Sequence, residues 1–120
     1  MIIALDYDKT FTADPKFWSE FILNVWRADH TVFICTMRLE TSRSFNEIKD
    51  ELIKYLGCFD AIKVPIIFSN HGWKKQAALD NGFEVDIWID DAPHWIAPPS
   101  TLKDIEDFCY ANNFTINGKP

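Results

Sequence analysis

Long hydrophobic runs are absent from this 120-residue chain. Its longest apolar stretches reach about seven residues, whereas a membrane-spanning helix needs about 20, so we expect no membrane contact. The first residues already follow a strand pattern, without the basic stretch and apolar core of a secretory signal. These absences predict a cytoplasmic protein.

Cysteine and positive charge are also scarce. The three cysteines, Cys35, Cys58 and Cys109, lack C-x-x-C spacing and are odd in number, which predicts neither a disulfide framework nor a zinc site. Twelve Lys and Arg against eighteen Asp and Glu give a net charge of −6. That balance disfavours broad nucleic-acid binding, which neutralises phosphates with basic side chains, but it leaves room for a small positive site.

What the chain does contain is enough apolar material for one folded domain. Hydrophobic residues make up 48% of the sequence and aromatic residues 15%, a composition typical of a globular rather than a disordered protein. Domains most often have about 100–150 residues, so a second independent domain does not fit. We therefore expect a single domain over residues 1–120.

Strand patterns alternate with helix patterns along this domain. Continuous apolar runs predict strands over residues 1–5, 31–36, 61–68 and 85–89, the third of them interrupted by Pro65. Helical spacing and capping residues predict helices over 15–29, 41–55, 73–81 and 101–112. The alternation predicts an α/β fold, a three-layer αβα Rossmann-like sandwich with a mainly parallel central sheet.

Acidic residues follow the first and the last of these strands. Asp6 and Asp8 lie two positions apart, where strand geometry aims both side chains to the same side. Like charges this close repel, so such a pair usually needs a divalent cation, a shared proton or separate chemical duties. A plainer alternative is that these residues form turn hydrogen bonds and a helix cap.

Asp90 and Asp91 end the last strand, and the carboxyl ends of parallel strands meet at one edge of the sheet. Together with Asp6 and Asp8 they would form an open cluster of oxygen ligands, which suits Mg²⁺. Calcium is the second choice, because the stretch from Asp6 lacks the glycine and the final glutamate of an EF-hand loop.

In order and spacing, these residues resemble the four motifs of the haloacid dehalogenase superfamily, in particular its phosphatases. The motifs are matched by Asp6-Tyr7-Asp8-Lys9-Thr10, by Thr36, by Lys74 or Lys75, and by Asp90-Asp91. Arg38, two residues after Thr36, resembles the Thr/Ser-x-Arg variant of the second motif. The resemblance covers residues 6–91, most of the chain.

The resemblance implies a role for each matched residue. Asp6 would be the nucleophile that forms an aspartyl-phosphate, and Asp8 the acid that protonates the leaving oxygen and then activates water. Mg²⁺ would be held by Asp6, by the backbone carbonyl of Asp8 and by Asp91, with Asp90 close by. Thr36 would hydrogen-bond a phosphoryl oxygen.

Two lysines compete for the third motif. The spacing Lys-x-x-Ala-Leu, which is common in the family, begins at Lys75, so we favour Lys75 as the residue that neutralises charge on nucleophile and phosphate. Lys74 and Arg38 are then candidates for binding the substrate phosphate. For Arg38, an exposed arginine at a helix start is an equally simple interpretation.

The predicted function is a Mg²⁺-dependent phosphatase acting through an aspartyl-phosphate. The chain has no room for a cap domain after the first or second motif, so the resemblance implies an open site. Its phosphorylated substrate would then be macromolecular, or a neighbouring subunit of a homo-oligomer would form the lid. A phosphotransferase and a non-catalytic phosphate- or partner-binding domain remain alternatives, although binding alone requires neither Asp6 nor Asp8.

Overall fold

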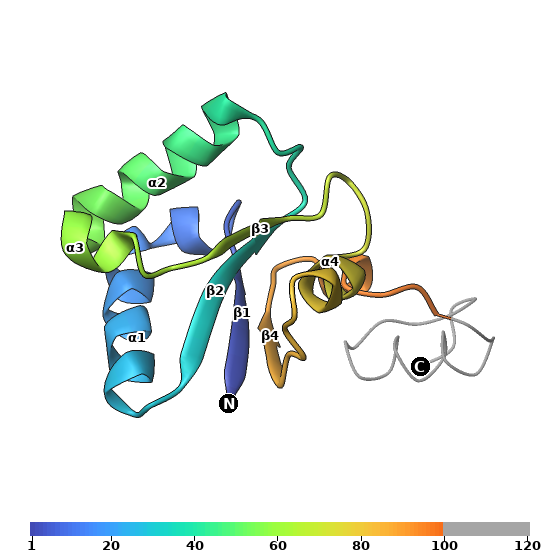
Figure 1. Ribbon diagram of the computed structural model, residues 1–120, viewed down its shortest axis with the longest axis horizontal. Helices are drawn as coiled ribbons and strands as arrows, with labels where there is room; N and C mark the ends of the chain where they lie inside the picture. The colour runs from blue at the N-terminus through green and yellow to red at the C-terminus, as the bar shows by residue number, and fades with distance from the viewer. Residues whose placement is uncertain (100–120) are drawn as a thin grey trace.

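The computed structural model describes residues 1–99, which contain a single parallel sheet (Figure 1). Its strands are β1 (Ile2–Asp6), β2 (Thr31–Thr36), β3 (Ile66–Phe68) and β4 (Ile87–Ile89), in the spatial order β3-β2-β1-β4. All three strand pairings are parallel. The predicted α/β class is therefore confirmed. The predicted helix over 101–112 and Cys109 lie outside the described residues.

Helices and short helical turns connect the strands. They are η1 (Phe11–Ala13), α1 (Pro15–Arg27), α2 (Ser42–Leu56), α3 (Cys58–Ala61), α4 (Lys74–Asp80) and η2 (Pro93–Trp95). Asp14 Oδ1 accepts the backbone N–H of Phe17 and so caps α1, and Thr41, which was predicted as the first residue of the second helix, instead caps it by accepting the N–H of Ser44. Gly57 ends α2 with a φ of 88°, a conformation that favours glycine.

The extended segment predicted over 61–68 is wrong in its first half. The chain instead forms α3 and a turn, in which Val64 N donates to Ala61 O, and only the end of the segment pairs as β3. Ala61 and Val64 are buried, which explains why the run looked like a strand. Pro65 has no N–H to donate, so the strand begins after it, at the edge of the sheet.

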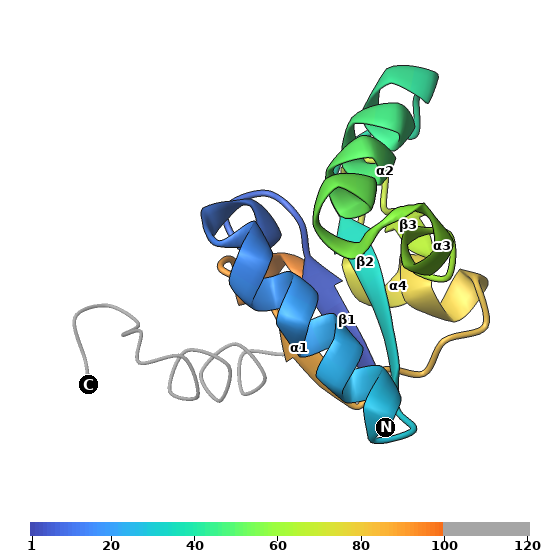
Figure 2. The ribbon, with the colours of Figure 1, turned by 90° about the vertical axis from the view of Figure 1, so that its left-hand side faces the viewer.

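Side chains that alternate along the strands form two buried clusters. Leu5 and Ile34, which are adjacent in the sheet, belong to a cluster with residues of α1 and α2. Ala4 and Phe33 point the other way and pack with Ala78 of α4. Figure 2 shows α1 lying along the sheet, with the end of α2 beside it. This alternation explains the nearly continuous apolar sequence of β1 and β2.

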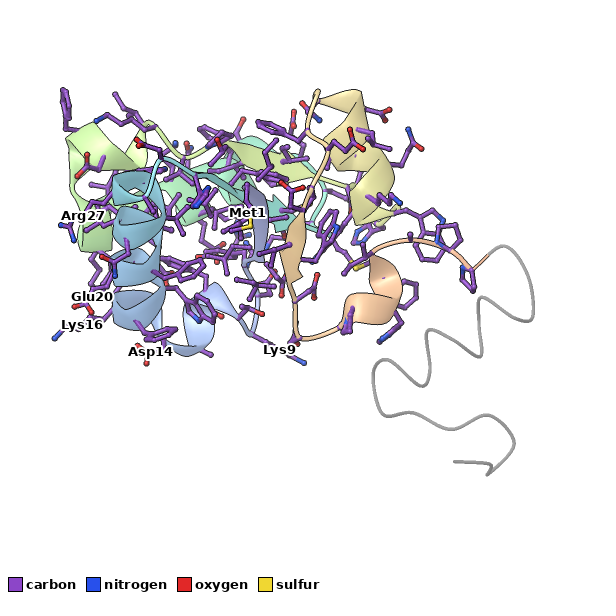
Figure 3. The ribbon with its side chains drawn as sticks, turned by 90° about the horizontal axis from the view of Figure 1, so that it is seen from below. Met1, Lys9, Asp14, Lys16, Glu20 and Arg27 are labelled. Carbon is purple, nitrogen blue, oxygen red and sulfur yellow. The ribbon has the colours of Figure 1, made fainter. Side chains whose placement is uncertain are left out.

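The polar side of α1 faces away from the sheet. Figure 3 shows Lys16, Glu20 and Arg27 along its outer side. Phe17 and Phe45 lie in the first turns of α1 and α2 and are 54% and 41% exposed. Within residues 1–99, no helix combines the length and apolarity needed to cross a bilayer.

Candidate active site

The candidate site lies where the strand order changes direction. The chain runs from β1 through β2 to β3 on one side, and then returns to place β4 on the other side of β1. Asp6 is the last residue of β1, and Asp90 and Asp91 directly follow β4. In parallel α/β sheets, ligands bind outside the carboxyl ends of the strands at such a switch point. The topology therefore brings the first and last acidic motifs together.

The carboxylates of Asp6, Asp90 and Asp91 converge at this point. Their oxygen atoms lie within 4.8 Å of one another. The side chain of Asp90 is 3% exposed and that of Asp6 is 7% exposed, whereas Asp91 lies at the surface. Two of the three carboxylates are thus shielded from water and need another source of compensation.

Lys74 supplies part of that compensation. It is the first residue of α4, and its Nζ donates to Asp6 Oδ1 at 2.6 Å and to Asp90 Oδ2 at 2.5 Å. Lys75, which motif spacing favoured, is exposed, and its backbone N–H is bonded to Ile96 O. The direction in which α4 starts thus brings Lys74, not the favoured Lys75, to the acidic residues.

Burial controls the ionisation of this group. Desolvation raises the pKa of Asp6 to about 7, while its hydrogen bond with Lys74 opposes the rise. Burial alone would lower the pKa of Lys74, but hydrogen bonds with Asp6 and Asp90 raise it. Thr10 Oγ1 donates to the second oxygen of Asp6 at 3.1 Å. Both carboxylate oxygens of Asp6 are therefore held in place.

The charges at the site fit a divalent cation. Three carboxylates and one ammonium group leave two negative charges without a partner when all four are ionised. Carboxylate oxygens are the ligands that hard cations prefer, and a carboxylate must be deprotonated to bind one. Asp6, Asp90 and Asp91 could together hold a metal ion.

Asp8 does not join this triad. β1 ends at Asp6, and residues 7–10 form turns in which Lys9 has a φ of 65°, so the strand rule does not extend to Asp8. Its carboxylate instead accepts two hydrogen bonds from Arg38, one from Nε at 2.9 Å and one from Nη2 at 2.8 Å. The side chain of Asp8 is therefore not part of the oxygen cluster that was expected to contain Asp6, Asp8, Asp90 and Asp91.

Thr36 is the last residue of β2 and is buried next to Arg38, the partner of Asp8. Its Oγ1 accepts the backbone N–H of Arg38 at 3.3 Å, so its own hydroxyl proton is available to another acceptor. Arg38 is not a freely exposed arginine, because it also contacts Glu47 of α2. The carboxylates of Asp8 and Glu47 raise the pKa of Arg38, which remains a cation throughout the physiological range.

Sequence reasoning missed two residues of this arrangement. Thr10 was recognised as part of the first motif but was not assigned a contact with Asp6. Glu47 gave no local signal, since it lies nine positions beyond Arg38, in the second turn of a helix. The glutamate pair Glu47 and Glu51, one helical turn apart, is the only pattern that could have suggested a common task on one face of α2.

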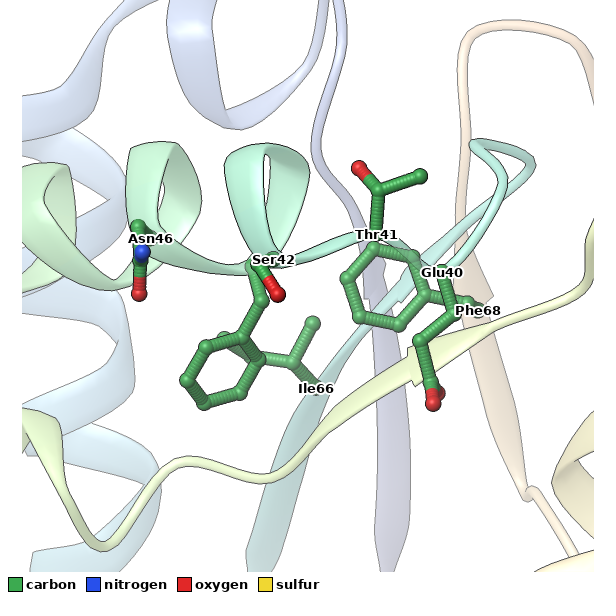
Figure 4. Close-up of a pocket in the computed structure, with 7 residues that line it drawn as sticks. Glu40, Thr41, Ser42, Asn46, Ile66 and Phe68 are labelled. Atoms are coloured by element: carbon green, nitrogen blue, oxygen red, sulfur yellow. The ribbon is translucent and has the colours of Figure 1, made fainter.

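Two hollows flank the edge strand β3. One, of about 450 Å³, lies between the start of α2 and β3; its lining includes Glu40, Thr41 and Phe68 (Figure 4). The other, of about 390 Å³, shares Glu40 and Phe68 and extends to Trp73. Phe68 pairs with Thr36 in the sheet, but neither hollow is lined by the acidic triad. The chemistry is therefore argued from the triad itself.

Comparisons of the chain with protein-family models, with curated proteins and with solved structures find no match.

Proposed function

We propose that this chain is a Mg²⁺-dependent phosphatase of the haloacid dehalogenase type, which hydrolyses phosphate monoesters through an aspartyl-phosphate. The observation that carries the proposal is the position of Asp6: it lies at the switch point of the sheet, with each oxygen held by a different donor and with Asp90 and Asp91 beside it. We further infer a three-layer αβα sandwich without a cap domain and a cytoplasmic location.

In the first half of the reaction, a carboxylate oxygen of Asp6 attacks phosphorus and the bond from phosphorus to the leaving oxygen breaks. Asp8 donates a proton to that leaving oxygen. In the second half, Asp8 takes a proton from water, which attacks the phosphorus and releases Asp6 and inorganic phosphate. The separate partners of Asp6 and Asp8 support this division of labour, because each carboxylate has its own environment.

Positioning of the phosphoryl group and electrostatic stabilisation of its charge would provide most of the rate enhancement. Mg²⁺, when held by Asp6, Asp90 and Asp91, supplies positive charge to the phosphoryl oxygens. Lys74 favours the ionised form of the buried Asp6 carboxylate and holds it in place. Thr36 has a hydroxyl proton to donate to a phosphoryl oxygen, and Arg38 offers a second cationic donor nearby.

A phosphotransferase would share the first half of this sequence and differ in the acceptor. Asp8 would then remove the proton of an acceptor hydroxyl group instead of that of water. A non-catalytic binding domain is the remaining alternative. The pairing of Lys74 with both Asp6 and Asp90 is the observation that favours a binding domain, because buried ion pairs of this kind also occur as purely structural networks.

Hydrolysis of an aryl phosphate by the purified chain tests the proposal. We expect phosphate release with Mg²⁺, none after exhaustive chelation, and recovery when Mg²⁺ is restored. Asp91→Asn should raise the Mg²⁺ concentration needed for half-maximal activity, because it removes a ligand from the triad. Asp80→Asn, which removes the same charge from the exposed end of α4, is the control. Full activity in the presence of chelator would refute the metal assignment.

A further inference from the structure

Arg38 is shared between two carboxylates that belong to different parts of the chain. Its Nε and Nη2 atoms donate to Asp8, at 2.9 and 2.8 Å. The other edge of the guanidinium faces Glu47 of α2, with Nη1 3.2 Å from Oε2 and Nη2 3.3 Å from Oε1. A planar guanidinium can serve two acceptors in this way because its donors form a rigid fork.

A ring and a second glutamate fix the position of this arginine. The guanidinium carbon of Arg38 lies 5.2 Å from the centre of the Tyr7 ring, and the Tyr7 hydroxyl donates to Glu51 Oε2 at 2.8 Å. Tyr7 is 1% exposed and belongs to the buried core cluster, so Arg38 lies against a packed surface. The side chains of Asp8 and Glu47 are similarly exposed, at 49% and 53%. Glu47 belongs to α2, which is anchored by the buried side chain of Ile48, whereas Asp8 lies in a turn.

The contact with Asp8 conflicts with the work proposed for that residue. Both oxygens of Asp8 accept charged hydrogen bonds from Arg38, which are strong and hold the carboxylate away from any other partner. To donate a proton to a leaving oxygen, Asp8 must first be released from Arg38 and take up a proton from water. The oxygens of an incoming phosphoryl group are the natural competitors, since arginine binds phosphate through the same two-donor edge.

We propose that Glu47 is a positioning residue: it retains Arg38 on α2 while the arginine exchanges Asp8 for the phosphoryl group of the substrate. This inference rests on the proposed function. Binding of substrate and release of Asp8 are then one event, because the same donors of Arg38 serve both. Without Glu47, Arg38 is held by Asp8 and Tyr7 alone and has no fixed point from which to change partners.

Kinetics of Glu47→Gln test the inference, because simple electrostatics predicts the opposite sign. Removing a negative charge near an anion site should by itself help phosphate to bind. We expect kcat/KM for an aryl phosphate to fall about tenfold, the scale of one charged hydrogen bond. Asp50→Asn, which removes a charge from an exposed position of the same helix, should remain near wild type. In an Arg38→Gln background, Glu47→Gln should have no further effect.

A second measurement does not depend on turnover. In a proton–nitrogen spectrum of the side chains, the Arg38 Nε–H signal should shift when inorganic phosphate is added with Mg²⁺, and this shift should be reduced in Glu47→Gln. A signal that saturating phosphate leaves unmoved would overturn the inference, as would wild-type kcat/KM in Glu47→Gln. Failure of the wild-type chain to hydrolyse any phosphate ester would overturn the proposed function instead, and the spectrum would still decide whether Arg38 changes partner.

Discussion

At the scale of single residues, Lys74 has the strongest expected effect. Its side chain is 3% exposed and lies between Asp6 and Asp90, so its removal leaves two shielded carboxylates without a cationic partner. Lys74→Met should lower kcat at least about a hundredfold and the free energy of unfolding by about 3 kcal/mol. Lys75→Met, at the neighbouring exposed position, should change neither. The reverse pattern in kinetics and denaturant unfolding would return the role to Lys75.

A second prediction at this scale concerns pH. The pKa of Asp6 is raised to about 7, mainly by burial, so in the metal-free protein Asp6 is largely protonated at pH 6 and ionised at pH 8. Because a metal ion binds the ionised form, the dissociation constant for Mg²⁺ should be about tenfold larger at pH 6 than at pH 8. Titration calorimetry at the two pH values measures this. Equal affinity would show that Asp6 is either not a ligand or already ionised at pH 6.

The partners of individual side chains were the hardest feature to predict. Lys74 and Lys75 are adjacent, and only the direction in which α4 starts decides which of them reaches Asp6. Asp8 leaves the strand pattern because the chain turns at Lys9, a residue with no sequence preference for a positive φ. The motifs predicted that Asp6 and Asp90 would lie close together, as they do, but motif spacing contains no information about these local directions.

At the scale of elements, α2 connects the core to the site. Leu52 of this helix is fully buried in the core. Glu47 and Glu51, also in α2, contact Arg38 and Tyr7. Leu52→Ala should reduce the free energy of unfolding by about 2–5 kcal/mol through the lost burial and the cavity that remains. Leu79→Ala, at a 46% exposed position of α4, should cost less than about 0.5 kcal/mol. Similar losses for both variants in chemical denaturation would contradict the packing of α2.

Elements with clear boundary signals were predicted well. β2 was predicted at its observed bounds, and the predicted helix starts at 15 and 41 agree with the observed starts of α1 and α2 to within one residue. The short helix α3 was missed because its four residues contain too few turns to show a helical period. Buried apolar residues around it gave the same pattern as a strand, and the difference depends on tertiary contacts rather than on local sequence.

At the scale of the whole molecule, the order of the strands creates the site. Asp6 and Asp90 are far apart in the sequence, and they meet because β4 pairs with β1 rather than with β3. Alternation of strands and helices predicted a parallel sheet, and the carboxyl-end rule predicted that the acidic motifs would meet. The strand order itself was not predicted.

The proposed lack of a cap domain leads to a prediction about substrates. An open site lacks a lid to enclose a small metabolite, so binding energy must come from a larger contact surface or from a neighbouring subunit. We expect kcat/KM for a phosphopeptide to equal or exceed that for a sugar phosphate. With a net charge of −6, phosphoproteins are preferred over nucleic acids as first candidates. A monomer, by solution mass, that strongly prefers one small metabolite would contradict the open site.

The covalent role of Asp6 is the central claim, and trapping the intermediate tests it most directly. Borohydride reduces an aspartyl-phosphate to homoserine, which peptide mass spectrometry can locate in the sequence. When the protein is quenched during turnover of an aryl phosphate with Mg²⁺ and then reduced with borohydride, we predict homoserine at position 6. We predict none at this position without substrate or in Asp6→Asn. Turnover without modification at position 6, or with modification at Asp8 instead, would contradict the account.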